Sequence, residues 1–262
     1  MTSGGQRMAI LDLRVRAISE GRAHFGIRLN GCTLAFAYIR KNACTAFKEM
    51  ILRESPHSRG EGETPIAFLH RCHLLSKVQI EAADTRICVL RDPGDRMASL
   101  YRNKFIQRQG HEEVFASYRR VTGLDPEQAR FRDLANIYLA ASEQDMDPHF
   151  HSQISHLAPI VYDRALRMGE IAGVMSDLLG SVTGARYFAQ RSNDSAGAVP
   201  FDDPSDDVPA DVLRDRYRRD GAMPSTRALL TDRTAGAVRS VYAADHGLLD
   251  DLARSKKDEI VQ

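Results

Sequence analysis

The chain has 262 residues, of which 43% are hydrophobic and 27% are charged, and its formal net charge at pH 7 is +1. This composition is ordinary for a globular protein, and the length suffices for one large domain or two small ones. The near-neutral charge disfavours a nucleic-acid-binding protein, and no apolar run of about 18 residues predicts a transmembrane helix.

The apolar run at residues 8–11 is too short to form the core of a signal peptide. The four cysteines form no C-x-x-C pair, which favours reduced thiols over a disulfide framework. They are Cys32, Cys44, Cys72 and Cys88. We therefore expect a cytoplasmic protein.

A first strand–loop–helix unit begins at residue 34. An apolar strand at 34–39 leads into a loop at 40–45, and a helix follows from residue 46. Continuous apolar strands, rather than alternating ones, are typical of strands buried on both faces of a sheet. The pattern predicts an α/β fold with a parallel central sheet flanked by helices.

A second unit of the same kind lies about fifty residues further on, with a strand at 87–90, a loop at 91–95 and a helix at 96–102. The N–H groups at the N-terminus of a helix have no intrahelical partner, and the helix dipole favours an anion there. Two such units predict a nucleotide that carries charged groups on both its 5′ and 3′ sides.

The remaining elements complete a single domain spanning residues 1–262. Residues 112–145 are helical in pattern, and a strand at 161–166 precedes a helix that ends at Gly180. The acidic, turn-rich stretch at 191–209 predicts a long surface loop or mobile segment. Two helices, at 208–220 and 231–253, close the chain.

Specific side chains of the two loops suit a phosphate ligand. Small residues let the backbone of the first loop curl around an anion, namely Asn42, Ala43, Cys44 and Thr45. Lys41 stands before them, where an ammonium could reach a bridging oxygen, whereas a Walker loop has its lysine after them. Arg91 offers a planar fork and Ser99 a hydroxyl. Each residue alone also fits an ordinary structural role, and the paired context favours a ligand site.

Longer motifs around both loops resemble those of sulfotransferases. Residues 40–47 (RKNACTAF) resemble P-K-x-G-[CST]-[ST]-x-W, and residues 91–105 (RDPGDRMASLYRNKF) resemble R-[DE]-P-x-x-R-x-x-S-x-Y-R-x-K-F. Residues 147–153, 162–177 and 242–246 resemble later motifs of the Golgi carbohydrate branch. Arg40 replaces the usual Pro, which fixes φ before the loop. The membrane anchor of that branch is missing, which predicts a soluble, bacterial-type member.

The resemblance implies a P-loop-like sulfotransferase fold and transfer of a sulfuryl group from 3′-phosphoadenosine 5′-phosphosulfate (PAPS), without a metal. It implies that Lys41 contacts the bridging oxygen and that residues 42–46, from Asn42 to Ala46, bind the 5′ side of the donor. It further implies that Arg91 and Ser99 bind the 3′-phosphate. Phe47 is either an adenine contact or a core aromatic. The implied acceptor is a hydroxyl, in the family by default a carbohydrate or glycolipid. The residues themselves leave the oligomeric state open.

A base must take the proton of the acceptor hydroxyl. His70 and His73 follow the apolar run 66–69, which we predict to be a strand ending beside the first loop. The resemblance favours His73, because several branches place a histidine there. His149 is a third option, expected instead to line the acceptor pocket. Its spacing to His151 is weak metal-ligand spacing without supporting ligands.

Two other functions remain open from the sequence. A nucleotide-dependent phosphotransferase of P-loop ancestry shares the strand–loop–helix arrangement, but it would need a Mg²⁺ ligand after the lysine. A non-catalytic nucleotide-binding interaction protein on the same scaffold is the other. Retention of Lys41, Arg91 and Ser99 together argues against it.

Overall fold

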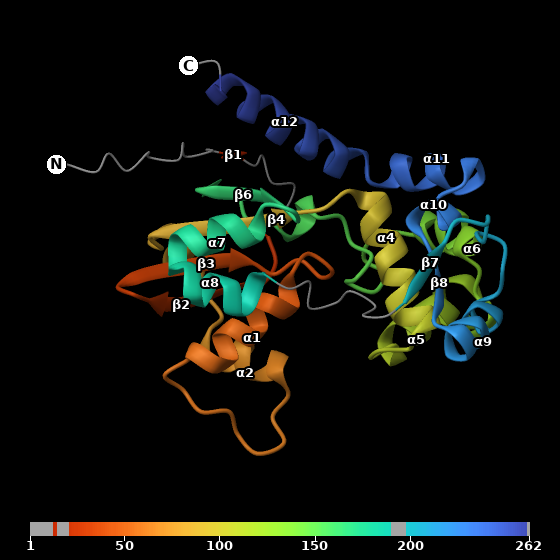
Figure 1. The fold of residues 1–262 in the computed structure, drawn as a ribbon, viewed down its shortest axis with the longest axis horizontal. Coiled ribbons are helices and arrows are strands. Elements are labelled where there is room, and N and C mark those ends of the chain that lie inside the picture. Colours follow the sequence, from red (N-terminus) through yellow and green to blue (C-terminus); the bar gives the residue numbers. More distant parts are fainter. Residues whose placement is uncertain (1–12, 15–20, 190–197, 261–262) are drawn as a thin grey trace.

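The computed structural model describes residues 13–14, 21–189 and 198–260. Figure 1 shows two halves, one built on a sheet with helices on its faces and the other mostly helical. Helix α12 (Ala243–Ile260) runs along the sheet half from the helical one. The early apolar strands and the mixed composition of the chain thus lead to the α/β architecture that the sequence predicts.

The central sheet has four strands in the order β2-β3-β4-β6. They are β2 (His24–Leu29), β3 (Cys32–Ala37), β4 (Thr85–Leu90) and β6 (Arg164–Arg167). Strands β3, β4 and β6 are parallel, with Phe36 opposite Ile87 and Leu90 opposite Arg167. The predicted parallel sheet is confirmed.

The edge strand β2 is antiparallel to β3 and was not predicted. A two-residue turn joins them, in which Asn30 has φ 50° and Gly31 has φ 80°. Asn-Gly is a favoured pair where both turn residues need positive φ, so a local signal for this hairpin was present in the sequence.

Two apolar clusters cover the two faces of the sheet. Phe36, Ile87 and Leu166 face one cluster, which packs against helices. These are α1 (Cys44–Glu54), α2 (Pro65–Cys72), α7 (Ile171–Leu179) and α8 (Ser181–Phe188). Ala35, Cys88 and other residues of the opposite face contact α12 and the chain around β5 (Val161–Tyr162). That face also carries α3 (Lys77–Glu81), and β5 pairs with β1 (Leu13–Arg14).

The expectation of a strand at 66–69 is wrong, because these residues belong to α2. The Thr64 side chain caps this helix by accepting a hydrogen bond from the N–H of Ala67 at 3.3 Å, and Pro65 occupies the first turn. A capping threonine followed by proline is a strong helix start, and it outweighs a short apolar run whose periodicity is ambiguous.

The helical half packs around its own core, which includes Tyr101, Tyr118, Phe131 and Tyr138. Its helices are α4 (Pro93–Tyr101), α5 (Glu112–Thr122), α6 (Phe131–Asn136), α9 (Ala210–Asp220), α10 (Thr226–Leu229) and α11 (Asp232–Val241). Helix α4 continues as a π-helix, Arg102–Ile106. Short 3₁₀ turns are Pro126–Gln128, Tyr138–Ala140 and, nearer the sheet, Ile154–His156.

The expected surface loop at 191–209 is only partly testable, since residues 190–197 lie outside the described part of the chain. Beyond them, β7 (Val199–Phe201) pairs in parallel with β8 (Ala222–Pro224). Asp206 is fully buried and accepts a 2.9 Å hydrogen bond from Arg233. The expectation is therefore wrong for residues 199–201, which form β7, whereas residues 202–209 lie outside helices and strands, with the carboxylate of Asp206 buried among them.

The predicted helix at 231–253 is two helices, α11 and α12, which meet at Tyr242. The buried Tyr242 hydroxyl donates a 2.6 Å hydrogen bond to the carbonyl of Phe150. This contact anchors the junction to the middle of the chain. Along the described stretches of the chain, no helix combines the length and the apolar character that crossing a membrane requires.

Candidate active site

The parallel strands β3, β4 and β6 all end at the same edge of the sheet. A cavity of about 890 Å³ opens there, between the sheet and the helical half. Lys41 follows β3, Arg91 follows β4 and Arg167 ends β6, and all three line the cavity together with Ser99 of α4. This edge is where open α/β sheets place ligands, and the volume suits a nucleotide. The structure thus brings the predicted Lys41, Arg91 and Ser99 to one cavity.

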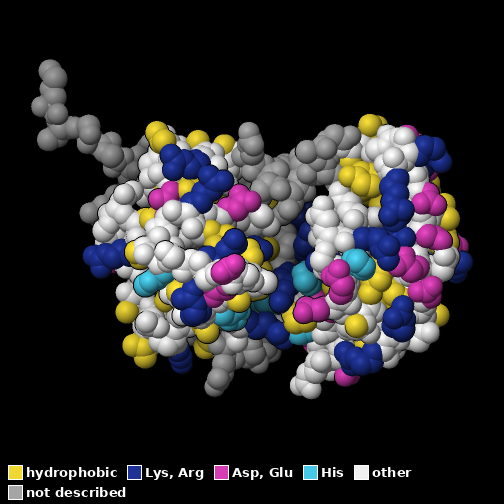
Figure 2. Space-filling model, turned by 90° about the horizontal axis from the view of Figure 1, so that it is seen from below, with side chains coloured by type: hydrophobic (Ala, Val, Ile, Leu, Met, Phe, Trp, Pro, Cys, Tyr) yellow, Lys and Arg dark blue, Asp and Glu magenta, His cyan; other side chains and the backbone are white. Residues whose placement is uncertain are grey.

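The first loop also lines a second cavity, of about 210 Å³. Its basic lining residues are Arg40, Lys41, Lys48, Lys104 and His149, and no lining residue is acidic. Lys41, Ala43, Asn103 and Gln109 line both cavities, so the two meet at the loop. In Figure 2, Lys, Arg and His side chains gather along the hollow between the two halves.

The first loop holds two residues in the left-handed region, Lys41 with φ 70° and Ala43 with φ 57°. This conformation costs about 1–2 kcal/mol for a residue other than glycine, and such strain gathers at functional sites. Ala43 is also the N-cap of α1 and supplies no side-chain hydrogen bond. The first turn of α1 therefore lacks a side-chain cap, as an anion-binding helix end requires.

The second loop differs from the first in its helix cap. The Asp92 carboxylate accepts a 3.0 Å hydrogen bond from the N–H of Asp95, and Pro93 stands in the first turn without an N–H. The N-terminus of α4 is thereby capped by the chain itself. The side chains of Arg91 and Ser99, rather than the helix end, are what this unit offers to a ligand.

Gln153 is a fully buried residue that ties the two loops together. Its Oε1 accepts hydrogen bonds from Asn42 Nδ2 at 2.5 Å and from the N–H of Arg91 at 2.9 Å. Its Nε2 donates to the carbonyl of Arg91 at 2.8 Å and to Asp245 Oδ2 at 3.3 Å. The Asp245 carboxylate in turn accepts hydrogen bonds from the backbone N–H groups of Gln153 and Ile154. One side chain thus fixes the spacing between the loops.

Arg96 is a second buried link, with no exposed surface. Its guanidinium donates to the carbonyls of Arg40 at 3.2 Å, His151 at 2.8 Å and His149 at 3.0 Å. The first loop and the segment around His149 are therefore bound to the same rigid group. Their relative position is set from within the core.

Lys41 lies in an electrostatic environment that weakens its hold on the proton. Burial lowers its pKa to about 8, and the positive charges of Lys104, Arg91 and Arg102 act in the same direction. An anion between these cations would relieve their mutual repulsion. The site is thus built to receive negative charge.

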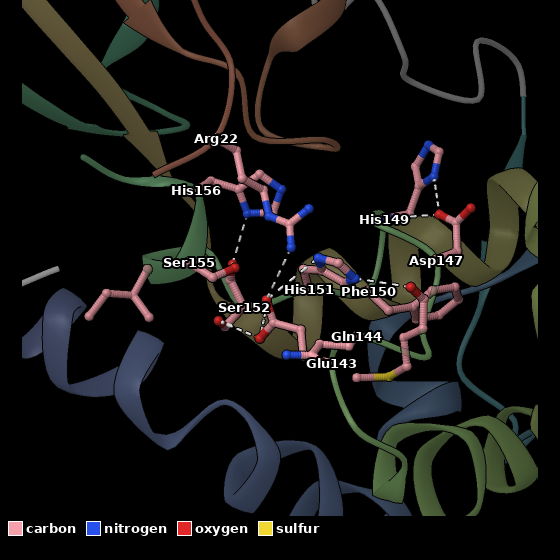
Figure 3. A network of polar contacts seen from close by, with 12 residues as sticks. Arg22, Glu143, Gln144, Asp147, His149, Phe150, His151, Ser152, Ser155 and His156 are labelled. Atoms are coloured by element: carbon pink, nitrogen blue, oxygen red, sulfur yellow. Dashed lines mark hydrogen bonds and ion pairs between the residues drawn. The ribbon is translucent and has the colours of Figure 1, made fainter. Parts of the chain in front are cut away.

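His149 lines the smaller cavity and forms a close pair with Asp147. Its Nδ1 lies 2.6 Å from Asp147 Oδ1, and the same oxygen accepts the N–H of His149 at 2.8 Å (Figure 3). Burial lowers the pKa of His149 to about 4, although Asp147 opposes this change. The imidazole is therefore neutral at pH 7, with Nδ1 as donor to the carboxylate.

Several predicted site residues lie elsewhere. Phe47 is in the core, stacked on Phe36 at 4.4 Å between ring centroids, and it lines neither cavity. Phe188, which packs edge-on against it, lines the larger cavity instead. The Asn42 side chain points inward to Gln153 and to the carbonyl of Val89. Helical geometry turns Phe47, three residues into α1, toward the sheet.

His70 and His73 line neither cavity. His70 is exposed on α2 and lies edge-on to Phe25. His73 is buried, with Nδ1 2.8 Å from the carbonyl of Gly26 and Nε2 2.8 Å from Ser55 Oγ. Because residues 66–72 form a helix and not a strand, these histidines are placed beside β2 rather than beside the first loop.

The roles of four residues could not be predicted from the sequence, namely Arg96, Gln153, Asp245 and Arg102. The first three lie within the motifs quoted for the resemblance, yet their roles depend on partners 53 to 111 residues away. Arg102 lines the larger cavity from the π-helix after α4. No local pattern in the sequence announces that change of helix type, which is frequent at functional sites.

A family model described as "Sulfotransferase family" matches residues 30–164, just over half of the chain. The match covers both loops, Arg96, His149 and Gln153. No curated protein and no solved structure matches the chain.

Proposed function

This chain belongs to the sulfotransferase family, and from that premise we propose that it transfers a sulfuryl group from PAPS to a hydroxyl of an acceptor. The observation that carries the proposal is the larger cavity. Lys41 of the first unit and Arg91 with Ser99 of the second unit line this one space. A donor with phosphate groups on both sides of its ribose would use both sets of residues.

The residues present fit the proposed donor. The uncapped start of α1 and Lys41 would hold the 5′-phosphosulfate. Arg91 and Ser99 would hold the 3′-phosphate, with Arg102 beside them in the same cavity. The donor supplies an already activated sulfuryl group. The protein's part is then to orient the reactants and to stabilise charge.

Lys41 has the central place in this arrangement, because it lines both cavities. Its ammonium would offset the charge that develops on the leaving oxygen. It stays charged below a pH of about 8, its pKa in the folded chain. The mutual repulsion of the surrounding cations would then be relieved by the bound donor.

We assign the acceptor to the smaller cavity, which meets the donor cavity at Lys41 and Ala43. Its polar lining and His149 suit a hydroxyl-bearing molecule, and we propose a carbohydrate or glycolipid. The four free cysteines support the proposal that the protein works in a reducing compartment, the cytoplasm.

Calorimetry with 3′-phosphoadenosine 5′-phosphate (PAP) against AMP tests the proposal. We expect a strong preference for PAP in the wild type. Arg91→Ala should weaken PAP binding by about 10- to 100-fold, the worth of a charge-assisted hydrogen bond, and leave AMP affinity nearly unchanged. Arg28→Ala, an exposed arginine on β2, is the matched control. Equal affinity for PAP, AMP and ATP would refute the proposal.

A further inference from the structure

One ring nitrogen of His149 is hydrogen-bonded to a carboxylate, and the other faces away from it. Nδ1 pairs with Asp147, and Nε2 lies on the side of the ring away from that carboxylate (Figure 3). Within the described residues no hydrogen bond to Nε2 is formed. Only about 17% of this side chain is exposed, so the remaining nitrogen sits at the wall of the smaller cavity and not in open solvent.

We propose that His149 is the general base of the reaction, with Asp147 as the residue that positions it. This inference rests on the proposed function and deepens it. The lone pair of Nε2 is directed by the Nδ1–Asp147 hydrogen bond, the same device that orients a histidine in hydrolase triads.

In the proposed step a proton moves to His149 and a sulfuryl group moves to the acceptor oxygen. His149 Nε2 takes the proton of the acceptor hydroxyl while the acceptor oxygen forms its bond to sulfur. The bond from sulfur to the bridging oxygen breaks, and its electron pair remains on that oxygen beside Lys41. The imidazolium that results is stabilised by Asp147, and it later returns the proton to solvent.

The fold holds this base at a fixed place relative to the first loop. Arg96 binds the carbonyls of both His149 and Arg40. From the other side, the N–H of Asp147 donates a 2.8 Å hydrogen bond to the Tyr138 hydroxyl, which contacts Ser117 Oγ at 2.7 Å. A base and a cation that must act on the same group are thus attached to one framework.

Other histidines lack this geometry. Both ring nitrogens of His73 already have partners, Gly26 and Ser55, and His70 is exposed away from the cavities. His246 lines the larger cavity, where the nucleotide would lie, and none of its hydrogen-bond partners is a carboxylate among the residues described. His149 is the histidine that lines the acceptor side.

The surroundings of His149 hold its imidazole in the neutral form, which is the form that can accept a proton. Asp147 favours the imidazolium, whereas burial and the positive charges of Lys104 and Arg40 oppose it. An anion bound in the adjoining cavity would favour the imidazolium further. Loading of the donor site should therefore raise the pKa of His149 toward the range in which a base is effective.

The first test compares turnover of single variants with PAPS and nitrophenyl glycosides, with water as the acceptor where no glycoside serves. His149→Ala should lower turnover by about 10²- to 10⁴-fold, the usual worth of a general base. Added imidazole should restore part of the loss, because it can occupy the space that the side chain leaves. His57→Ala, an exposed histidine, is the control. His70→Ala, His73→Gln and His246→Ala test the rival positions.

The second test needs no turnover. Imidazole NMR of the wild type should show the Nδ1–H form of His149, and PAP should raise the pKa of this histidine while the resonances of the distant His70 ring stay unchanged. Asp147→Asn should shift the tautomer balance while PAP binding stays intact, and it should lower turnover less than His149→Ala does.

The outcomes separate the inference from the proposed function. If the wild type binds no PAP, the proposed function fails and the inference fails with it. If the wild type transfers sulfuryl groups while His149→Ala keeps full turnover, or its loss is not rescued by imidazole, the inference alone is overturned. Loss confined to His70→Ala, His73→Gln or His246→Ala also overturns it.

Discussion

The two strand–loop–helix units of this protein are similar in sequence order but differ in how they meet a ligand. In the first, Lys41 and Ala43 adopt left-handed φ and α1 starts without a side-chain cap. In the second, Asp92 caps α4 and Arg91 stands before it. The first unit offers backbone N–H groups and a lysine, and the second offers side chains on a helix that is already satisfied.

A helix that follows a strand is therefore not by itself an anion site. An acidic cap satisfies the first turn and puts negative charge where an anion would bind. The first unit suits the group that changes during the reaction, because it combines strain, an uncapped helix and a partly buried lysine. The second unit suits a ligand group that is bound but does not react.

Lys41→Ala should show the largest effect and tests the reactive role of the first unit. We expect turnover to fall by about 10²- to 10³-fold, as when one charge-stabilising group is removed from an active site. PAP binding, measured by calorimetry, should change only a few-fold. Equal loss of binding and turnover would contradict the assigned role.

Gln153→Leu breaks the link between the two units. The change leaves Asn42 and both backbone groups of Arg91 without their Gln153 partner. We expect the free energy of unfolding in urea to fall by about 2–4 kcal/mol, because buried polar groups lose hydrogen bonds. Gln128→Leu, at an exposed position, should change it by less than about 0.5 kcal/mol. Similar values for both variants would show that the link is dispensable.

The pH dependence of kcat/KM sharpens the comparison, because the first unit relies on a titratable cation and the second on arginine. Lys41 has a pKa of about 8, and the role proposed for it requires its charged form. The rate should thus be highest between about pH 4 and pH 8, where His149 is neutral and Lys41 is charged, and it should fall above pH 8. Lys41→Arg should move this fall to higher pH, since arginine stays charged, even if the maximum rate is lower. If kcat/KM of Lys41→Arg falls at the same alkaline pH as that of the wild type, Lys41 is not the group responsible for the fall.

The smallest effect concerns the caps. Asp92→Ala removes the cap of α4 and should lower the free energy of unfolding by about 1 kcal/mol. Ala43→Ser at the start of α1 should change it by less than about 0.5 kcal/mol, since a residue at φ 57° lacks the extended backbone of a capping serine. Thermal and urea unfolding measure both. Equal stabilities would mean that the helix ends do not differ.

Local patterns predicted the elements that carry the site. The apolar strands β3 and β4, the loops after them and the helix end at Gly180 with φ 84° were all readable from the chain. The family resemblance is confirmed by the match to the sulfotransferase family. Local patterns erred at 66–69, where a short apolar run suited both strand and helix.

The positions of side chains in the fold were harder to predict from the sequence than the strands and helices, because these positions depend on distant partners. Phe47 was left open between ligand contact and core, and packing on Phe36 and Phe188 decides for the core. No sequence pattern marks Gln153 as important, and its role follows from its hydrogen bonds to Asn42, Arg91 and Asp245 in the folded chain. A hydrogen bond between residues 111 positions apart leaves no periodic trace.

Strand and helix signals are local, so the amino-acid sequence was enough to predict two strands that lead into polar loops, with Lys41, Arg91 and Ser99 after them. Contacts between distant segments were needed to show that these side chains share one cavity, that Asp92 caps α4, and that His149 rather than His73 lines the smaller cavity. The physical reason is that the ends of parallel strands and the buried guanidinium of Arg96 bring together segments that are far apart along the chain.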